Sequence, residues 1–89
     1  MKTSDQVLVK RLKTGEDVAL SNIFDQYWEM LFKMADNVLL DKSASKDLVQ
    51  EVFVNLWERR KIAEINNLRA YLIQAVKYKV ASQLRKKKF

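Results

Sequence analysis

The side chains that could do chemistry in this sequence fall into two groups of different charge. Residues 47–60, DLVQEVFVNLWERR, combine carboxylates with amides, whereas residues 59–89 combine basic side chains with the rings of Tyr71 and Tyr78. The sequence has no Cys and no His, which excludes disulfides, the usual zinc sites and Cys or His nucleophiles. It also has no Gly-rich phosphate loop and no recognisable cluster of metal ligands. The available chemistry is therefore recognition by charge, amides and aromatic rings, and we expect neither a cofactor nor enzymatic activity.

Charge is distributed unevenly along the 89 residues. Residues 1–58 hold seven Lys/Arg and ten Asp/Glu, a balance of −3, and residues 59–89 hold ten against one, a balance of +9, which together give the net charge of +6. This asymmetry predicts a basic end that faces a polyanion and a mildly acidic remainder that faces another partner. There is no apolar run near about 18 residues and no signal-peptide pattern, so we expect a cytoplasmic protein without a membrane span.

Four helices are predicted to position the two groups within a single domain, residues 1–89. The absence of proline, the single glycine and the many helix formers favour an all-α fold, a compact bundle of about four helices. The three- and four-residue spacing of apolar side chains predicts helices at about 4–13, 16–40, 43–60 and 67–86. The expected N-caps are Thr3, in a capping box with Gln6, then Ser43, and Asn66 or Asn67.

The third predicted helix has a broad apolar side and a polar side that surrounds one valine. The apolar side is formed by Ala44, Leu48, Val49, Val52, Phe53, Leu56 and Trp57. The opposite side carries Asp47, Gln50, Glu51, Val54, Asn55 and Glu58. This composition suits a protein partner that brings Arg or Lys around a small apolar spot. It also suits a merely solvated helix face, which helix geometry alone would favour.

The fourth predicted helix also has two different sides. Its buried stripe is predicted to be Leu72, Ile73, Val76, Val80, Ala81 and Leu84, and its opposite face carries Tyr71, Gln74, Tyr78, Ser82 and Arg85. Tyrosine rings can support unstacked bases, and a glutamine can read a base edge. The two rings could equally be half-buried packing residues, because a tyrosine ring is amphipathic.

Basic side chains surround this aromatic face, and phosphate contacts by them would be sensitive to salt and largely independent of base sequence. They are Arg59, Arg60, Lys61, Arg69, Lys77, Lys79 and the run from Arg85 to Lys88. The terminal lysines could instead form a frayed, solvated tail. In the loop 61–67, Asn66 and Asn67 offer donors and acceptors for a base edge, although both are also suited to capping the last helix.

Three segments, in this order and spacing, carry a resemblance to a known family. DLVQEVFVNLWERR is preceded by LKTGEDVALSNIFDQYWEMLFKMA and followed by AYLIQAVKYKVASQLRKKK. Together they resemble the second conserved region of bacterial sigma-70 family sigma factors, in particular the extracytoplasmic-function (ECF) group, from about Val7 to Lys88. The resemblance implies a domain that binds core RNA polymerase and that recognises and helps melt the promoter minus-ten element in transcription initiation. A C-terminal region 4 helix-turn-helix domain is absent from these residues, so we expect the chain to be a fragment of a longer factor.

The resemblance also assigns roles to both groups of residues. It implies that the polar side of the third helix docks on a coiled-coil of the largest polymerase subunits, through Asp47, Gln50, Glu51, Val54 and Asn55. It implies that Tyr71 lies near the upstream fork of the melted DNA, that Gln74 reads the upstream base pair and that loop 61–67 captures a flipped-out base. The expected DNA-binding residues are Arg59, Arg60, Lys61, Asn66, Asn67, Arg69, Tyr71, Gln74, Lys77, Tyr78 and Arg85. An anti-sigma factor is a further partner that the resemblance implies.

The sequence departs from the family at Lys77, Tyr78 and Ser82, where many members have Arg-Asn followed four residues later by Asp. We therefore expect Tyr78 to contact a different base sequence from the one that the family's asparagine contacts. We also expect modest promoter melting, because no aromatic cluster fills the loop. Two other interpretations stay open: a helical module that binds only protein, and a nonspecific nucleic-acid-binding domain. A preference for minus-ten DNA together with salt dependence would distinguish the sigma factor from both.

Overall fold

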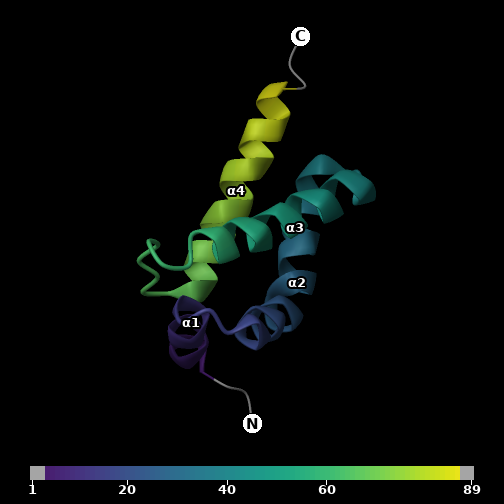
Figure 1. The fold of residues 1–89 in the computed structure, drawn as a ribbon. Helices are drawn as coiled ribbons and strands as arrows, with labels where there is room; N and C mark the ends of the chain where they lie inside the picture. Colours follow the sequence, from purple (N-terminus) through teal and green to yellow (C-terminus); the bar gives the residue numbers. More distant parts are fainter. Residues whose placement is uncertain (1–3, 87–89) are drawn as a thin grey trace.

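The computed structural model of the chain describes residues 4–86, and within that range it contains four helices and no strand. They are α1 (Asp5–Lys13), α2 (Asp17–Leu39), α3 (Lys42–Glu58) and α4 (Leu68–Lys86). α2 contacts each of the other three helices, α3 crosses between α2 and α4, and the last turns of α4 project beyond the bundle (Figure 1). The predicted all-α fold and number of helices are confirmed. None of the helices in residues 4–86 is long and apolar enough to cross a membrane.

Three side chains cap the starts of helices, and two of them differ from the predicted caps. The side chains of Ser4, Asp41 and Asn67 each accept a hydrogen bond from the backbone amide three residues later, at 3.3, 3.0 and 3.0 Å. The predictions of Thr3 and Ser43 as caps were therefore wrong, and Thr3 lies outside the described residues. The alternative of Asn67 as the cap of α4 is confirmed.

The connections between the first three helices use left-handed backbone conformations. After α1, the amides of Gly15 and Glu16 donate to the carbonyl oxygens of Leu12 and Arg11 at 3.0 and 3.1 Å, which is a Schellman motif. Gly15 has φ 88°, a conformation that a residue without Cβ adopts readily. α2 ends at Leu39, and its C-cap residue Leu40 has φ 52° without being glycine. The short turn that follows reverses the chain into α3.

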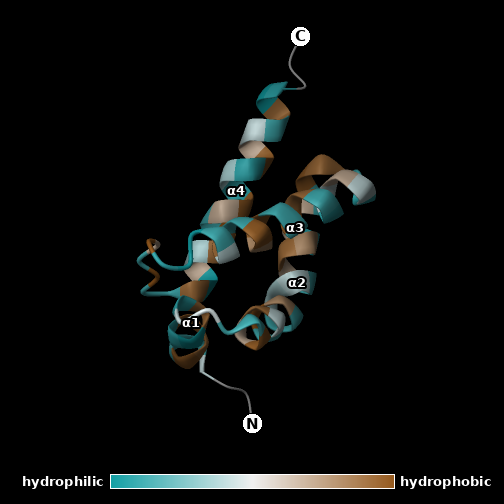
Figure 2. Ribbon diagram, viewed as in Figure 1, coloured by the Kyte–Doolittle hydropathy of each residue, from teal (hydrophilic) through white to brown (hydrophobic). Residues whose placement is uncertain are grey.

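The core is formed by apolar side chains from all four helices. They include Leu8, Leu12, Ile23, Leu31, Ala35, Val49, Val52, Leu56, Leu72 and Val76, each at most 2% exposed. Hydrophobic and hydrophilic residues alternate along the helices, as the spacing predicted (Figure 2). Two residues expected to be buried are exposed instead, namely Ala81 and Leu84. Ala81 and Leu84 belong to the projecting end of α4, so their side of the helix has no neighbour to cover it (Figure 1).

An aromatic cluster joins α2 to α3. The ring centroids of Phe24 and Phe53 lie 4.9 Å apart with a tilt of 56°. On the same side of α2, Trp28 stacks on Phe32 with centroids 5.0 Å apart and an interplanar angle of 7°. Tilted and offset arrangements of this kind are favoured by the charge distribution of the rings. The cluster therefore fixes α3 against α2 and holds its polar side outward.

A polar contact anchors α1 on α2. The hydroxyl of Tyr27 donates a short hydrogen bond to the carboxylate of Asp5, and Nε2 of Gln26 donates to the same carboxylate at 3.0 Å. Burial, followed by this hydrogen bond and the negative charge of Asp5, raises the pKa of Tyr27 to about 12. The Tyr27 side chain is therefore held in its neutral form within the α1–α2 contact.

Candidate nucleic-acid and protein interfaces

The polar side of α3 faces outward along its length. The carboxylates and amide of Asp47, Gln50 and Glu51 are exposed, Val54 is 54% exposed and Asn55 is half-buried. This placement follows from the apolar side, because Leu48, Val49, Val52, Phe53 and Leu56 are all buried against the other helices. The structure thus presents the predicted row of residues as one continuous surface, with the valine among polar groups.

The row borders an apolar groove between α2 and α3, here called the α2/α3 groove. Its lining residues are Leu20, Ser21, Phe24, Asp25, Gln50, Phe53, Val54 and Trp57. Gln50 and Val54 thus belong to both the row and the groove. Apolar surface with carboxylates and amides at its edge is the composition of a protein-binding patch. The α2 side of this surface, including Asp25, did not figure among the predicted site residues because its position depends on helix packing.

A second hollow lies where the loop before α4 meets the first turns of that helix, here called the loop hollow. It is lined by Glu64, Ile65, Asn66, Asn67, Ala70, Tyr71, Gln74, Ala75 and Tyr78. Five of the predicted DNA-binding residues, from two separate segments, are therefore brought together. Tyr71 is half-buried and packs against the core, whereas Tyr78 is 71% exposed. The ring of Tyr71 therefore forms part of the wall of the loop hollow, and the ring of Tyr78 lies at its edge.

The asparagines at this hollow have different local roles. Asn67 caps α4 through its side-chain oxygen, which accepts from the Ala70 amide at 3.0 Å. Asn66 is exposed and lines the hollow without belonging to the helix. Both side chains are exposed, but only that of Asn67 is engaged in a capping hydrogen bond within residues 4–86.

The predicted cationic residues divide according to their surroundings. Arg59, Lys61, Lys77 and Arg85 are exposed. Arg60 is half-buried, with its guanidinium over the Trp57 ring, and its Nε is buried with no hydrogen-bond partner among the described residues. Arg69 lies two positions before Tyr71, about 200° around the helix, and its charge acts on the hydroxyl of Tyr27. Arg69 is itself exposed, and it does not line the loop hollow.

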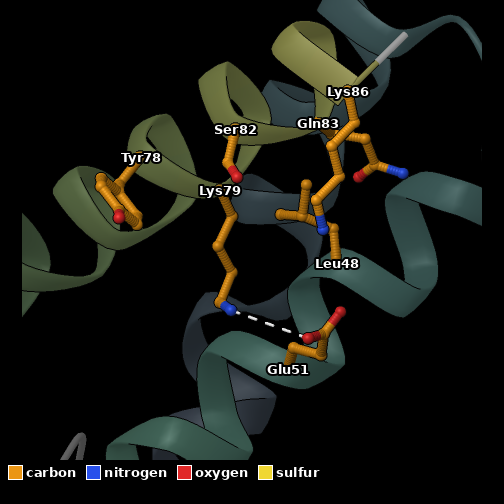
Figure 3. A pocket seen from close by; sticks show the side chains of 7 residues that line it. All are labelled: Leu48, Glu51, Tyr78, Lys79, Ser82, Gln83 and Lys86. Atoms are coloured by element: carbon orange, nitrogen blue, oxygen red, sulfur yellow. Dashed lines mark ion pairs between the residues drawn. The ribbon is translucent and has the colours of Figure 1, made fainter.

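A third hollow separates α3 from the second half of α4, here called the α3/α4 cleft. It is lined by Leu48, Glu51, Tyr78, Lys79, Ser82, Gln83 and Lys86 (Figure 3). Within it, Nζ of Lys79 lies 3.7 Å from Oε1 of Glu51. This ion pair joins the two helices that carry the acidic and the basic surface. Lys79 was predicted as one of the cations around the aromatic face, but its pairing with Glu51 joins residues that are distant in sequence.

The described residues contain no cluster of three or more acidic, His or Cys side chains that could hold a metal ion. The candidate interfaces are three surfaces. They consist of an acidic row beside an apolar groove, an aromatic hollow beside a loop, and a cleft with cations on one wall.

A family model described as Sigma-70 region 2 matches residues 23–89, which is more than half of the chain. The chain therefore belongs to the sigma-70 region 2 family. Comparison with curated proteins and with solved structures gives no match. Membership in this family gives the chain a sigma factor's role in transcription initiation, with core RNA polymerase and promoter DNA as its partners in general terms.

Proposed function

We propose that α4 and loop 61–67 engage the promoter minus-ten element in a partly melted form, as ECF sigma factors do. The observation that carries this proposal is the loop hollow, in which asparagines from the loop meet two tyrosines and a glutamine from α4. A base taken out of the stack needs a ring to lie against and polar groups that meet its edge. The loop hollow offers both within one surface.

The residues of the loop hollow have distinct proposed roles. Tyr78 is exposed and stacks against an unpaired base, while the half-buried Tyr71 supports the base step beside it. Gln74 is exposed between them on the same side of α4 and reads a base edge through its amide. Asn66 meets the captured base from the loop. Each of these roles requires a side chain that a base can reach from solvent.

Exposed cations supply the part of the binding energy that does not depend on base sequence. Arg59, Lys61, Lys77 and Arg85 are placed to neutralise backbone phosphates on either side of the loop hollow. The predicted phosphate contacts of Arg60 and Arg69 stay predictions. Arg60 is the weaker candidate of the two, since its guanidinium lies over Trp57, whereas Arg69 is exposed.

For core RNA polymerase, we propose that the row from Asp47 to Asn55 and the α2/α3 groove form one docking surface. Gln50 and Val54 lie on both features and would be at its centre. An apolar centre with carboxylates and amides around it favours a partner helix or coiled-coil that presents apolar side chains flanked by Arg or Lys.

A titration of the 89-residue chain into fluorescently labelled single-stranded DNA tests the nucleic-acid part of this proposal. The two oligonucleotides carry a non-template minus-ten sequence and a scrambled sequence of the same composition, and each is titrated at two salt concentrations. A preference for the minus-ten strand together with weaker binding at higher salt supports the proposal. Salt dependence without preference would indicate a nonspecific nucleic-acid binder, and neither effect would indicate a module that binds only protein.

A further inference from the structure

The α3/α4 cleft is adjacent to the loop hollow, because Tyr78 lines both. Its volume is about 320 Å³. A ligand that lies against the exposed ring of Tyr78 therefore reaches the edge of the cleft without crossing the rest of the surface. None of the proposed contacts with bases or polymerase accounts for the cationic wall of this cleft.

One side of α4 supplies that wall with cations and hydrogen-bond donors. Lys79, Ser82, Gln83 and Lys86 are spaced by three and four residues, so they lie along the same side of the helix. The first three are half-buried and Lys86 is exposed. In the first half of α4 the core is reached by the apolar stripe of Leu68, Leu72, Val76 and Val80. Beyond that stripe the side of α4 that approaches α3 becomes polar, and it lines a cleft because burying those groups without partners would be costly.

The two lysines of this wall extend from α4 toward α3 (Figure 3). The side chain of Lys79 is only 24% exposed, and within residues 4–86 its ion-pair partner is Glu51, whose side chain is 69% exposed. The carboxylate of Glu51 thus shows where an anionic oxygen can lie beside Lys79. No carboxylate lies within 4 Å of Lys86 among the described residues, so its charge is not neutralised by an ion pair.

The opposite wall limits what the cleft can hold. It includes Glu51, and a neighbouring hollow that shares Leu48, Glu51 and Gln83 continues toward Asp47 and Asp41. Anionic groups are therefore disfavoured toward the start of α3 and favoured beside α4. The cleft can therefore hold one anionic group beside α4, but not several along its length.

We propose that the α3/α4 cleft is a binding site for a single phosphate group. Lys79 and Lys86 neutralise the group, and the Ser82 hydroxyl and the Gln83 amide donate hydrogen bonds to its oxygens. The site takes a backbone phosphate next to the nucleotide that stacks on Tyr78, and Lys79 exchanges its partner Glu51 for the phosphate. This inference rests on the proposed DNA-binding role of α4, and it extends the path of the nucleic acid from the loop hollow into the cleft.

Salt-dependent titrations of single-stranded DNA test the proposal with the variants Lys79→Gln and Lys86→Gln. Each is expected to weaken binding roughly two- to fivefold. Each should also reduce the slope of log K against log salt by about 0.7, the value for one phosphate contact on a single strand. Glu51→Gln should strengthen binding by a similar factor, because it removes the anion that competes for Lys79.

The matched control is Lys42→Gln. Lys42 is also paired with a carboxylate of another helix, with its Nζ 3.5 Å from Oδ2 of Asp36, and the substitution removes the same charge. It is expected to leave the salt slope unchanged, since it lies away from the cleft. If Lys79→Gln and Lys86→Gln affect the slope no more than Lys42→Gln does, the phosphate site is wrong.

A second experiment separates this proposal from the proposed function. Sodium pyrophosphate is titrated into ¹⁵N-labelled chain, and amide chemical shifts are followed by NMR. Shifts at residues 79–86 that disappear in Lys79→Gln support the site even if no DNA binds, and they would then identify free phosphates as its source. If DNA binds but neither pyrophosphate shifts nor altered slopes are seen, the phosphate site fails while the proposed function stands. Absence of shifts together with absence of DNA binding rejects both.

Discussion

The guanidinium of Arg60 lies over the indole ring of Trp57, with its Cζ atom 4.0 Å from the ring centroid. Its Nη1 atom also donates a hydrogen bond of 2.8 Å to the carbonyl oxygen of Trp57. These two contacts close the end of α3 at the point where loop 61–67 begins. Arg59, the residue before Arg60, is exposed. Two adjacent arginines therefore carry the same charge in different surroundings, and their substitutions should have different effects.

Replacing Arg60 with Ala should lower the free energy of unfolding by about 1 kcal/mol, because a cation–π contact and a hydrogen bond are lost. Arg59→Ala should leave stability within about 0.5 kcal/mol of the original chain, as is usual for exposed positions, and should weaken DNA binding. Urea unfolding followed by circular dichroism, with a DNA titration beside it, measures both quantities. Equal loss of stability in the two variants would show that the Trp57 contact contributes nothing.

The contact between Tyr27 and Asp5 should make stability depend on pH in the alkaline range. The folded chain holds the Tyr27 proton more tightly than the unfolded chain does, with a pKa of about 12 against 10.0. The resulting contribution is fully present below pH 10 and is lost as the pH rises from 10 toward 12. Tyr27→Phe should therefore show a smaller fall in the free energy of unfolding between those pH values.

The control for this prediction is Tyr78→Phe, which removes a hydroxyl from a side chain that is 71% exposed. All lysines are present in all three proteins, so the comparison isolates the hydroxyl of Tyr27. Urea unfolding at several pH values between 8 and 11.5 gives the required free energies. The proposed linkage is absent if Tyr27→Phe and the original chain lose stability in parallel.

Leu40 should be a site at which glycine stabilises the fold. Its φ of 52° and ψ of 38° are left-handed, and its side chain is 83% exposed, so replacement costs little packing. The conformation costs roughly 1–2 kcal/mol for a residue with Cβ, and the greater freedom of glycine in the unfolded chain offsets part of that gain. Leu40→Gly is expected to raise the free energy of unfolding by up to about 1 kcal/mol.

The reciprocal substitution is Gly15→Ala, at φ 88°. No atom lies within 4 Å of the Cβ that it would add, so any loss reports the backbone conformation alone. We expect a loss of about 1 kcal/mol. Thermal and urea unfolding of the two variants measure these opposite changes, and a destabilised Leu40→Gly would contradict the explanation based on backbone conformation.

The proposed polymerase surface predicts that Gln50→Ala weakens binding to core RNA polymerase without changing helicity. Gln50 lies on both the polar row and the α2/α3 groove, where a contact is shielded from solvent. Glu51→Arg should weaken binding further by reversing a charge, although it also breaks the ion pair with Lys79. A pull-down with purified core polymerase, using folded variants, measures the effect. Asn37→Ala, an exposed amide at the far end of α2, is the control, and equal binding by all variants would remove α3 from the interface.

The periodicity of the sequence was sufficient to predict the four helices and most of their buried sides. The ends of the helices were harder to predict, because several residues near each end could act as caps. Ser43 has a suitable side chain, but the chain takes its extended conformation at Asp41, immediately after Leu40 reverses it. Exposure of Leu84 was missed for another reason: spacing identifies a side of a helix but not how far the neighbouring helices extend.

The candidate site was predicted in part. Side-chain chemistry was enough to predict Asn66, Tyr71, Gln74 and Tyr78 as candidate DNA contacts. The fold brings these four residues to one surface. The ion pair of Lys79 with Glu51 could not be predicted, since it depends on how α3 and α4 cross. Ser45 is a similar case. It is fully buried, and its hydroxyl donates to the carbonyl oxygen of Asp41 at 2.8 Å, which no apolar pattern indicates.

If the loop hollow reads bases, Gln74→Ala should lose specificity for minus-ten DNA. The measured quantity is the ratio of dissociation constants for scrambled and minus-ten single strands, compared between the original chain and the variant. Asn22→Ala, an exposed amide on α2, serves as the control. We predict that Gln74→Ala lowers the ratio about fivefold or more, as loss of a base-edge contact does, and that Asn22→Ala leaves it unchanged. An unchanged ratio in Gln74→Ala, with both strands still bound, would contradict the account.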